Sequence, residues 1–233
     1  MLPTLIVGIM ITQHTPMSRL DAFVKSFALP TPNYRLMPYF VLGRSHDGNL
    51  QAGADFPSNT LVLDIKENMD DGKTFAWFSR AVELFNEIPS HPMNGIVKMD
   101  VDVSANWTEL GLSVVPKLGT GYYLGRIIDN ALCGGGSYCP PAGCTDFSSD
   151  CWTYMSGGWY GLALDLAKTL VGCGYARDHV VGYEDLMVGK WIKHCGADSA
   201  VVYGVNNGDF FCHSKAVTDG DVKDGFYQRV NCV

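Results

Sequence analysis

Asp100 and Asp102 are the carboxylates whose spacing points most directly to chemistry. They are separated by one residue and follow the apolar run 95–99, which predicts a buried strand that leads straight into acidic side chains. Carboxylates at the carboxyl end of such a strand face the place where open α/β sheets bind ligands. Their oxygens suit Mg²⁺ or Mn²⁺, which complete their shells with substrate phosphates and water. The alternative is structural, because aspartates also cap turns.

Glu184 and Asp185 form a second acidic pair, at the predicted start of a helix. Acids at this position complement the helix dipole, which is a sufficient structural explanation. The functional alternative makes one of them a general base that takes a proton from an attacking hydroxyl. We expect the helix N-terminus to lower the pKa of such a base and to keep it ionised.

Two further candidates are a histidine near the end of the chain and a glycine-rich segment. His213 could complete a metal shell with Asp102, or it could be a partly buried structural side chain. Gly157 and Gly158 would let backbone approach a sugar closely, and the following residues, Trp159 and Tyr160, could stack on its ring. An ordinary turn with core aromatics remains the alternative.

The elements that must position these residues alternate between short apolar runs and segments of helical period. This pattern predicts a parallel or mixed sheet covered by helices. The expected strands span 5–11, 39–43, 60–65 and 95–100, and the expected helices begin near Ser18, Asp71 and Glu184. Residues 131–158 lack a period and are predicted to be a loop. Its cysteines lack the Cys-x-x-Cys pairs of structural zinc sites, so we expect disulfides or free thiols there.

The size and charge of the chain limit its partners. Its 233 residues predict one domain, 1–233, and its formal net charge is −7 without a Lys/Arg run. We therefore expect no nucleic-acid partner, because such proteins need basic surfaces. A diphosphate ligand would need a bridging divalent cation. The apolar run 5–11 is too short to cross a bilayer, so we expect no membrane span in this chain.

Taken in order, the motifs resemble glycosyltransferase family 31, the β-1,3-galactosyltransferase and Fringe group. The resemblance covers most of the chain and is carried by segments 40–43, 64–74, 98–102, 154–160, 184–189 and 211–214. It implies a single GT-A domain, with a Rossmann-like, mostly parallel mixed sheet flanked by helices. It also implies an inverting transferase that moves a hexose, of galactose or N-acetylhexosamine type, from a UDP-sugar to a glycan hydroxyl with Mn²⁺ or Mg²⁺.

The resemblance also implies a role for each matching residue. Asp185 would be the catalytic base, supported by Glu184. The metal would be held by Asp102, Asp100 and His213. The nucleotide sugar would contact Arg19, Lys73, Lys98, Asp100, Gly157 and Gly158, while Trp159 and Tyr160 would stack on a sugar.

The sequence departs from the family at three places. Val101 replaces the middle aspartate of the metal-binding triplet, and Cys212 interrupts a Phe-His pair. The family's usual members are anchored in the Golgi membrane, and no anchor is evident here. We therefore expect a soluble protein, cytoplasmic if Met1 is the natural start, or a Golgi luminal catalytic domain cut from a longer chain. The alternative functions are a metal-independent glycoside hydrolase and a non-catalytic carbohydrate-binding relative.

Overall fold

The computed structural model describes residues 2–27, 31–44, 56–68, 71–128, 139–148, 151–196 and 198–205, together with the backbone of 211–213. A seven-stranded sheet in the order β3-β2-β1-β4-β7-β6-β8 lies at its centre. Its strands are β1 (Thr4–Met10), β2 (Arg35–Arg44), β3 (Thr60–Lys66), β4 (Gly95–Asp100), β6 (Tyr122–Ile127), β7 (Met155–Ala163) and β8 (Val201–Gly204). The short strands β5 (Val103–Ala105) and β9 (Phe211–His213) form a separate two-stranded sheet.

The sheet is mostly parallel. β1 runs parallel to both β2 and β4, β2 parallel to β3, and β6 parallel to β8, whereas β7 runs antiparallel to β4 and β6. Every residue of β1 is buried, as expected for a central strand that is covered on both faces. The structure thus confirms the predicted fold class, an α/β protein with a mixed sheet flanked by helices. The assignment of 1–233 to one domain stays a prediction.

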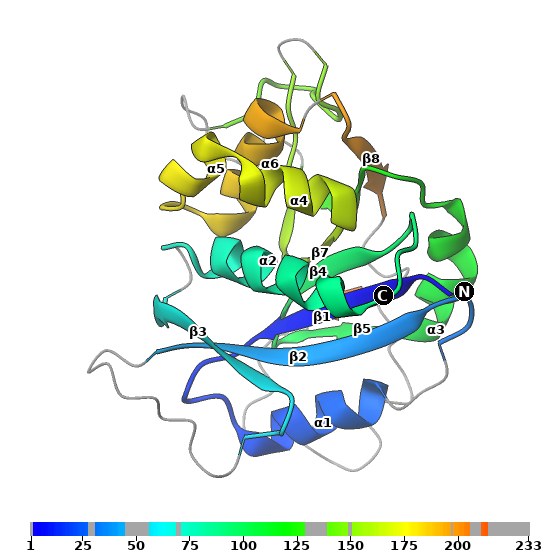
Figure 1. Cartoon of the computed structure of the whole chain (residues 1–233), viewed down its shortest axis with the longest axis vertical. Coiled ribbons are helices and arrows are strands. Elements are labelled where there is room, and N and C mark those ends of the chain that lie inside the picture. The colour runs from blue at the N-terminus through cyan, green and yellow to red at the C-terminus, as the bar shows by residue number, and fades with distance from the viewer. Residues whose placement is uncertain are drawn as a thin grey trace.

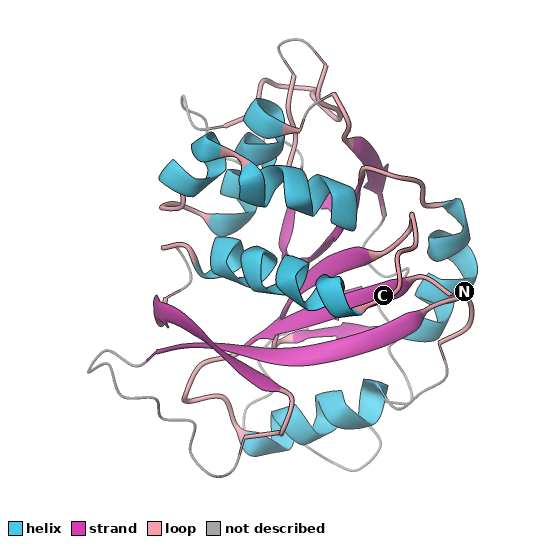
Figure 2. Ribbon diagram, in the orientation of Figure 1, coloured by secondary structure: helices cyan, strands magenta, loops and turns pink. Residues whose placement is uncertain are grey.

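Helices lie on both sides of the sheet (Figure 2). The longer ones are α1 (Met17–Phe27), α2 (Lys73–Leu84), α4 (Leu164–Gly172) and α6 (Glu184–Cys195), and the shorter ones are α3 (Trp107–Glu109), α5 (Gly174–Asp178), η1 (Phe85–Glu87), η2 (Leu110–Val114) and η3 (Val115–Lys117). In Figure 1, helices α2, α4 and α6 lie above β1, β2 and β3, and α1 lies below these strands. Among the described residues, no helix is long and apolar enough to cross a membrane.

Close packing of α2 on the sheet explains one glycine in the first strand. A Cβ atom at Gly8 would lie 2.3 Å from the Trp77 ring, which is itself completely buried. The Trp77 indole donates a hydrogen bond to the Val97 carbonyl, at 3.2 Å. Gly8 therefore leaves the space that lets α2 lie directly on β1 and β4.

One predicted element was wrong. Residues 155–158 were expected to end a loop, but they begin β7, which pairs with β4 and β6. Glycine is a poor strand former by itself, and tertiary pairing overrides that local preference here. The Gly-rich segment is thereby part of the central sheet.

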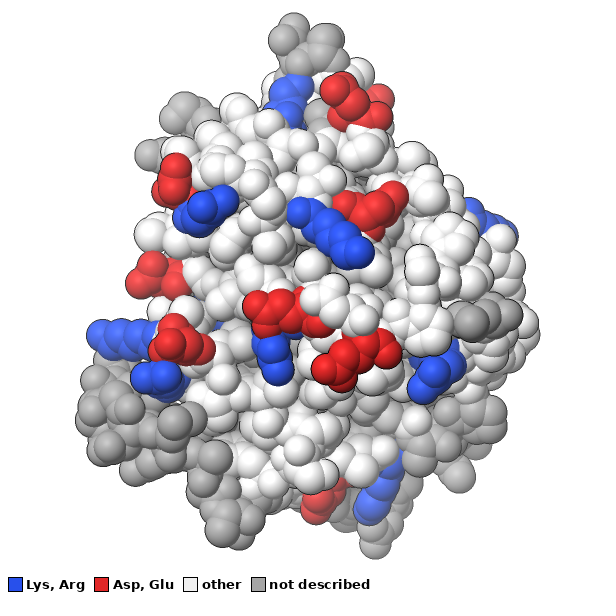
Figure 3. All heavy atoms as spheres, viewed as in Figure 1, with Lys and Arg blue, Asp and Glu red and all other residues white. Residues whose placement is uncertain are grey.

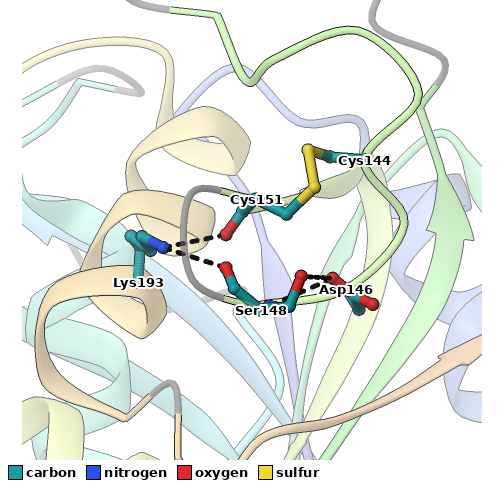
Figure 4. The surroundings of a disulfide bond; sticks show 5 residues. All are labelled: Cys144, Asp146, Ser148, Cys151 and Lys193. Atoms are coloured by element: carbon teal, nitrogen blue, oxygen red, sulfur yellow. Dashed lines mark hydrogen bonds between the residues drawn. A yellow bond between two sulfur atoms is a disulfide. The ribbon is translucent and has the colours of Figure 1, made fainter.

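The cysteine-rich region contains disulfides, which is one of the two alternatives expected from the sequence, disulfides or free thiols. Cys144 is bonded to Cys151, and Cys139 is also disulfide-bonded, whereas Cys133 lies outside the described residues. The Lys193 ammonium on α6 donates to the Ser148 and Cys151 carbonyls, at 3.2 and 3.0 Å (Figure 4). These contacts fix the cross-linked loop to the second half of α6.

A second disulfide secures the carboxyl end of the same helix. Cys173, between α4 and α5, is bonded to Cys195, the last residue of α6. The carboxyl end of α6 is thus covalently tied down. Its first residues are the acidic pair Glu184 and Asp185.

Candidate active site

The carboxyl ends of the parallel strands and the first turns of α2 and α6 meet at one edge of the sheet, on the left of Figure 1. Met10, the last residue of β1, pairs with both Val41 of β2 and Asp100 of β4. This register brings the end of β4 into line with its neighbours. Residues that follow the strands therefore collect at this edge, where ligands bind in open α/β sheets.

A buried lysine organises the acidic residues there. Lys98 of β4 is 0% exposed, and its Nζ lies 2.6 Å from Glu184 Oε1 and 2.7 Å from Asp100 Oδ1. It also donates a hydrogen bond to the Gly157 carbonyl. Burial alone would lower the pKa of Lys98, but the charges of Glu184 and Asp100 raise it above its ordinary value. The ammonium therefore stays charged, and these contacts occupy its three donors.

Lys98 was predicted to contact the nucleotide sugar; that contact stays a prediction, and the surroundings of Lys98 favour a structural role. A lysine with no exposed surface and with carboxylates on its ammonium has no hydrogen left for a phosphate. Its role is to position the residues around it.

Glu184 is held by both of its carboxylate oxygens. While Oε1 pairs with Lys98, Oε2 accepts hydrogen bonds from the Tyr160 hydroxyl at 2.5 Å and from Thr74 Oγ1 at 3.2 Å. These partners come from β4, β7 and α2, so Glu184 joins three elements to the start of α6. A carboxylate engaged on both oxygens is a poor proton acceptor for a substrate.

Asp185, the next residue, is in a different environment. Its Oδ1 accepts a hydrogen bond from the Leu186 backbone N–H, at 2.7 Å, and its side chain is only partly buried. Burial, reinforced by the neighbouring charge of Glu184, raises the pKa of Asp185 above the ordinary value for aspartate. This direction is opposite to the lowering that the helix N-terminus alone predicts. A raised pKa makes Asp185 a stronger base.

Gly157 packs directly against the acidic pair. A Cβ atom at this position would lie 2.9 Å from Glu184 Oε1 and 3.4 Å from Asp185 Oδ2. Glycine therefore allows β7 to approach the start of α6 this closely. Gly158, its neighbour, is buried in β7.

The rings expected to stack on a sugar lie in the core instead. Trp159 is 1% exposed and Tyr160 is 0% exposed. β7 is an interior strand, so side chains on both of its faces are covered. The two aromatics support the sheet, and Tyr160 also holds Glu184.

Lys73 is likewise a structural residue. It is 1% exposed, and its Nζ lies 2.5 Å from Glu67 Oε1 and 2.7 Å from the Ile11 carbonyl oxygen. Glu67 Oε2 in turn accepts a hydrogen bond from the Gly43 N–H, at 2.5 Å. Lys73 and Glu67 thus tie the start of α2 to the ends of β1, β2 and β3. The contact of Lys73 with the nucleotide sugar stays a prediction that these partners disfavour. No local pattern in the sequence had singled out Glu67.

The three proposed metal ligands come from two segments that the small sheet brings together. Asp100 ends β4, Asp102 lies in the turn that follows, and Val103 of β5 pairs with His213 of β9. The backbone of His213 is therefore opposite the residue that follows Asp102. The side chain of His213 lies outside the described residues. Among described side chains, no group of three or more His, Cys, Asp or Glu residues is arranged to hold a metal.

Arg19 and the distribution of surface charges are the remaining features to describe. Arg19 is partly buried in the first turn of α1, which follows β1. On the face seen in Figure 3, acidic and basic side chains are interspersed, without an extended patch of either sign among the described residues. That face therefore offers no broad one-signed field to steer a charged ligand.

Comparisons of the sequence with models of known families and with curated proteins find no match. Among solved structures, the galactosyltransferase LgtC in complex with donor and acceptor sugar analogs is 14% identical, with a TM-score of 0.41 over 85% of this chain and 72% of that chain. Mouse xyloside xylosyltransferase 1, in its apo form, is 11% identical, with a TM-score of 0.42 over 88% of this chain and 85% of that chain. Both TM-scores are below 0.5, so neither similarity decides the function of this chain.

Proposed function

We propose that the protein is an inverting glycosyltransferase that moves a hexose from a UDP-sugar to a hydroxyl of a glycan. This proposal rests on one observation: the adjacent acids Glu184 and Asp185 have different surroundings. Lys98, Tyr160 and Thr74 hold both carboxylate oxygens of Glu184, while Asp185, which is partly buried, has a raised pKa. A carboxylate such as that of Asp185, with a raised pKa and a fixed neighbour, suits a general base.

The diphosphate of the UDP-sugar donor is the group that needs a cation. The chain carries a net charge of −7, so a diphosphate at this acidic edge requires a bridging Mn²⁺ or Mg²⁺. Asp102, Asp100 and His213 would hold this ion, because they carry oxygen and nitrogen ligands of the types that such ions accept. When bound, the cation neutralises charge on the diphosphate. Arg19, Gly157 and Gly158 are further candidates for contacts with the nucleotide sugar.

Asp185 acts on the acceptor. It takes the proton from the acceptor hydroxyl as the hydroxyl oxygen forms a bond to the anomeric carbon. The bond from that carbon to the β-phosphate oxygen breaks at the same time, and UDP leaves with the electron pair. A single displacement of this kind inverts an α-linked donor to a β-linked product, with the donor expected to carry galactose or an N-acetylhexosamine.

The disulfides bear on the compartment. Cys144–Cys151 and Cys173–Cys195 persist in oxidising surroundings and are rare in the cytosol. Of the two compartments expected from the sequence, this chemistry favours the Golgi lumen.

Calorimetry of UDP binding with and without Mn²⁺ tests the donor site. We expect wild-type protein to bind UDP only with Mn²⁺, and Asp102→Ala to lose this binding. Asp198→Ala, which removes an exposed acid from the turn before β8, should bind as wild type does. Equal affinity in wild type and Asp102→Ala would remove Asp102 from the metal site. Cleavage of glycosides in the presence of EDTA, without UDP binding, would replace the transferase by the hydrolase.

A further inference from the structure

The two most exposed large apolar side chains among the described residues belong to one short segment. Tyr183 is 75% exposed and Val181 is 69% exposed, and both lie between α5 and α6. This segment leads directly into Glu184 and Asp185. Isolated apolar side chains are common on protein surfaces, but two neighbours beside a candidate base are a reason to expect a ligand.

Helix formation does not explain the tyrosine. Tyr183 is the N-cap residue of α6, a position that favours Ser, Thr, Asp or Asn because their side chains accept backbone hydrogen bonds. Its side chain makes no cap hydrogen bond, and its carbonyl accepts the Met187 N–H at 2.9 Å. The backbone thus starts the helix, and the ring remains on the surface.

Contacts at His179 and Val181 hold the backbone of this segment. Val181 forms a β-bridge with Asp71, next to the first turn of α2. The Trp191 indole donates a hydrogen bond to the His179 carbonyl, at 2.7 Å, and Trp191 is 1% exposed. The Tyr183 ring therefore projects from a fixed backbone, which lowers the entropic cost of using it to bind a ligand.

We propose that Tyr183 and Asp71 form an acceptor subsite that receives a neutral pyranose ring. This inference rests on the proposed function. The apolar face of the sugar stacks on the Tyr183 ring, and the exposed Asp71 carboxylate accepts hydrogen bonds from sugar hydroxyls. The subsite lies at the start of α6, whose second residue is Asp185. We assign the stacked sugar as the acceptor whose hydroxyl Asp185 deprotonates. Asp71 and Asp185 together disfavour a sugar that carries its own negative charge.

Ligand-observed NMR titration with simple glycosides tests the subsite. The probes are methyl β-galactoside, methyl N-acetyl-β-glucosaminide and methyl α-mannoside, with methyl β-glucuronide as the anionic comparison, all in the presence of UDP and Mn²⁺. We expect at least one neutral probe to bind and the glucuronide to bind more weakly. Tyr183→Ala should weaken neutral binding about tenfold, the size expected for a lost stacking contact. Tyr183→Phe should keep it.

Leu112→Ala is the matched control, because Leu112 is another exposed apolar side chain, 54% exposed, in η2. It should leave the binding of every probe unchanged. Equal affinity of Tyr183→Ala and wild type would overturn the subsite, as would binding of none of the neutral probes or equal binding of the glucuronide. Titration of UDP with Mn²⁺ separates the two proposals. Its failure in wild type rejects the donor site, whereas retained UDP binding with unaltered glycoside binding rejects only the Tyr183 subsite.

Discussion

Replacing Lys98 by methionine should strongly destabilise the protein. The substitution keeps the length of the side chain but removes the cation that lies 2.6 Å from Glu184 and 2.7 Å from Asp100. Removing one partner of a buried ion pair costs about 3–5 kcal/mol, because the remaining charge is left uncompensated. Lys98 is 0% exposed, so water cannot replace it. For a chain of this size, the loss corresponds to a fall in Tm of roughly 6–20 °C.

Urea denaturation with the disulfides intact measures the free energy of unfolding. Lys98→Met should lose about 3–5 kcal/mol. The double variant Lys98→Met/Glu184→Gln should be more stable than Lys98→Met, because it also removes the uncompensated carboxylate. Lys193→Met is the control, because Lys193 on α6 donates hydrogen bonds to the backbone carbonyls of Ser148 and Cys151. It should cost much less.

The pH dependence gives an independent check. Burial raises the pKa of Asp100, and Lys98 opposes that rise. Without Lys98, the folded-state pKa of Asp100 should rise further above its unfolded value. Stability from such a group is present at low pH and lost as the pH rises through the folded-state pKa. The difference between wild type and Lys98→Met should therefore be larger at pH 8 than at pH 5. A loss of unfolding free energy below about 1 kcal/mol, which is the range of exposed ion pairs, would refute the strong buried interaction of Lys98. Additive effects of Lys98→Met and Glu184→Gln in the double variant would refute it as well.

Three further predictions concern the same edge of the sheet and its supports. Asp185→Asn should lower turnover by about 10²–10⁴-fold and keep UDP binding. Because the pKa of Asp185 is raised, the rate of the wild-type enzyme should fall on the acid side at a pH above the ordinary pKa of aspartate, which steady-state kinetics against pH would show. A wild-type rate in the variant would remove Asp185 as the base. Lys73→Met should cost about 3–5 kcal/mol in urea denaturation while the folded protein keeps its UDP affinity; a selective loss of UDP binding would restore Lys73 as a ligand contact. Replacing both Cys173 and Cys195 by serine should cost about 3 kcal/mol, since this disulfide closes a loop with a sequence separation of 22, and unchanged stability would show that the cross-link constrains little.

Local sequence patterns were sufficient for the main elements and for the places of several candidate residues. Apolar runs predicted β1, β3 and β4, and the acidic pair predicted the start of α6 at Glu184. These features depend on hydrophobic period and helix-end chemistry, which operate over a few residues. They also placed Asp100 and Asp102 at the end of a buried strand before any tertiary contact was known.

Long-range pairing decided what those residues do. Lys98 and Glu184 are 86 positions apart, and Thr74 and Glu184 are 110 apart, so no local pattern reveals that Glu184 is held while Asp185 is left partly exposed. The same holds for Lys73, which only the convergence of three strand ends buries.

The aromatic residues show the difference most directly. By type and neighbours, Trp159 and Tyr160 could have been surface rings, and only the position of β7 inside the sheet buries them. Tyr183 carries the same chemistry but stands at a helix start, where the fold leaves it exposed. The sequence specifies which side chains can stack, bind a cation or accept a proton. The tertiary structure decides which of them meet the solvent, because burial depends on segments that are distant along the chain.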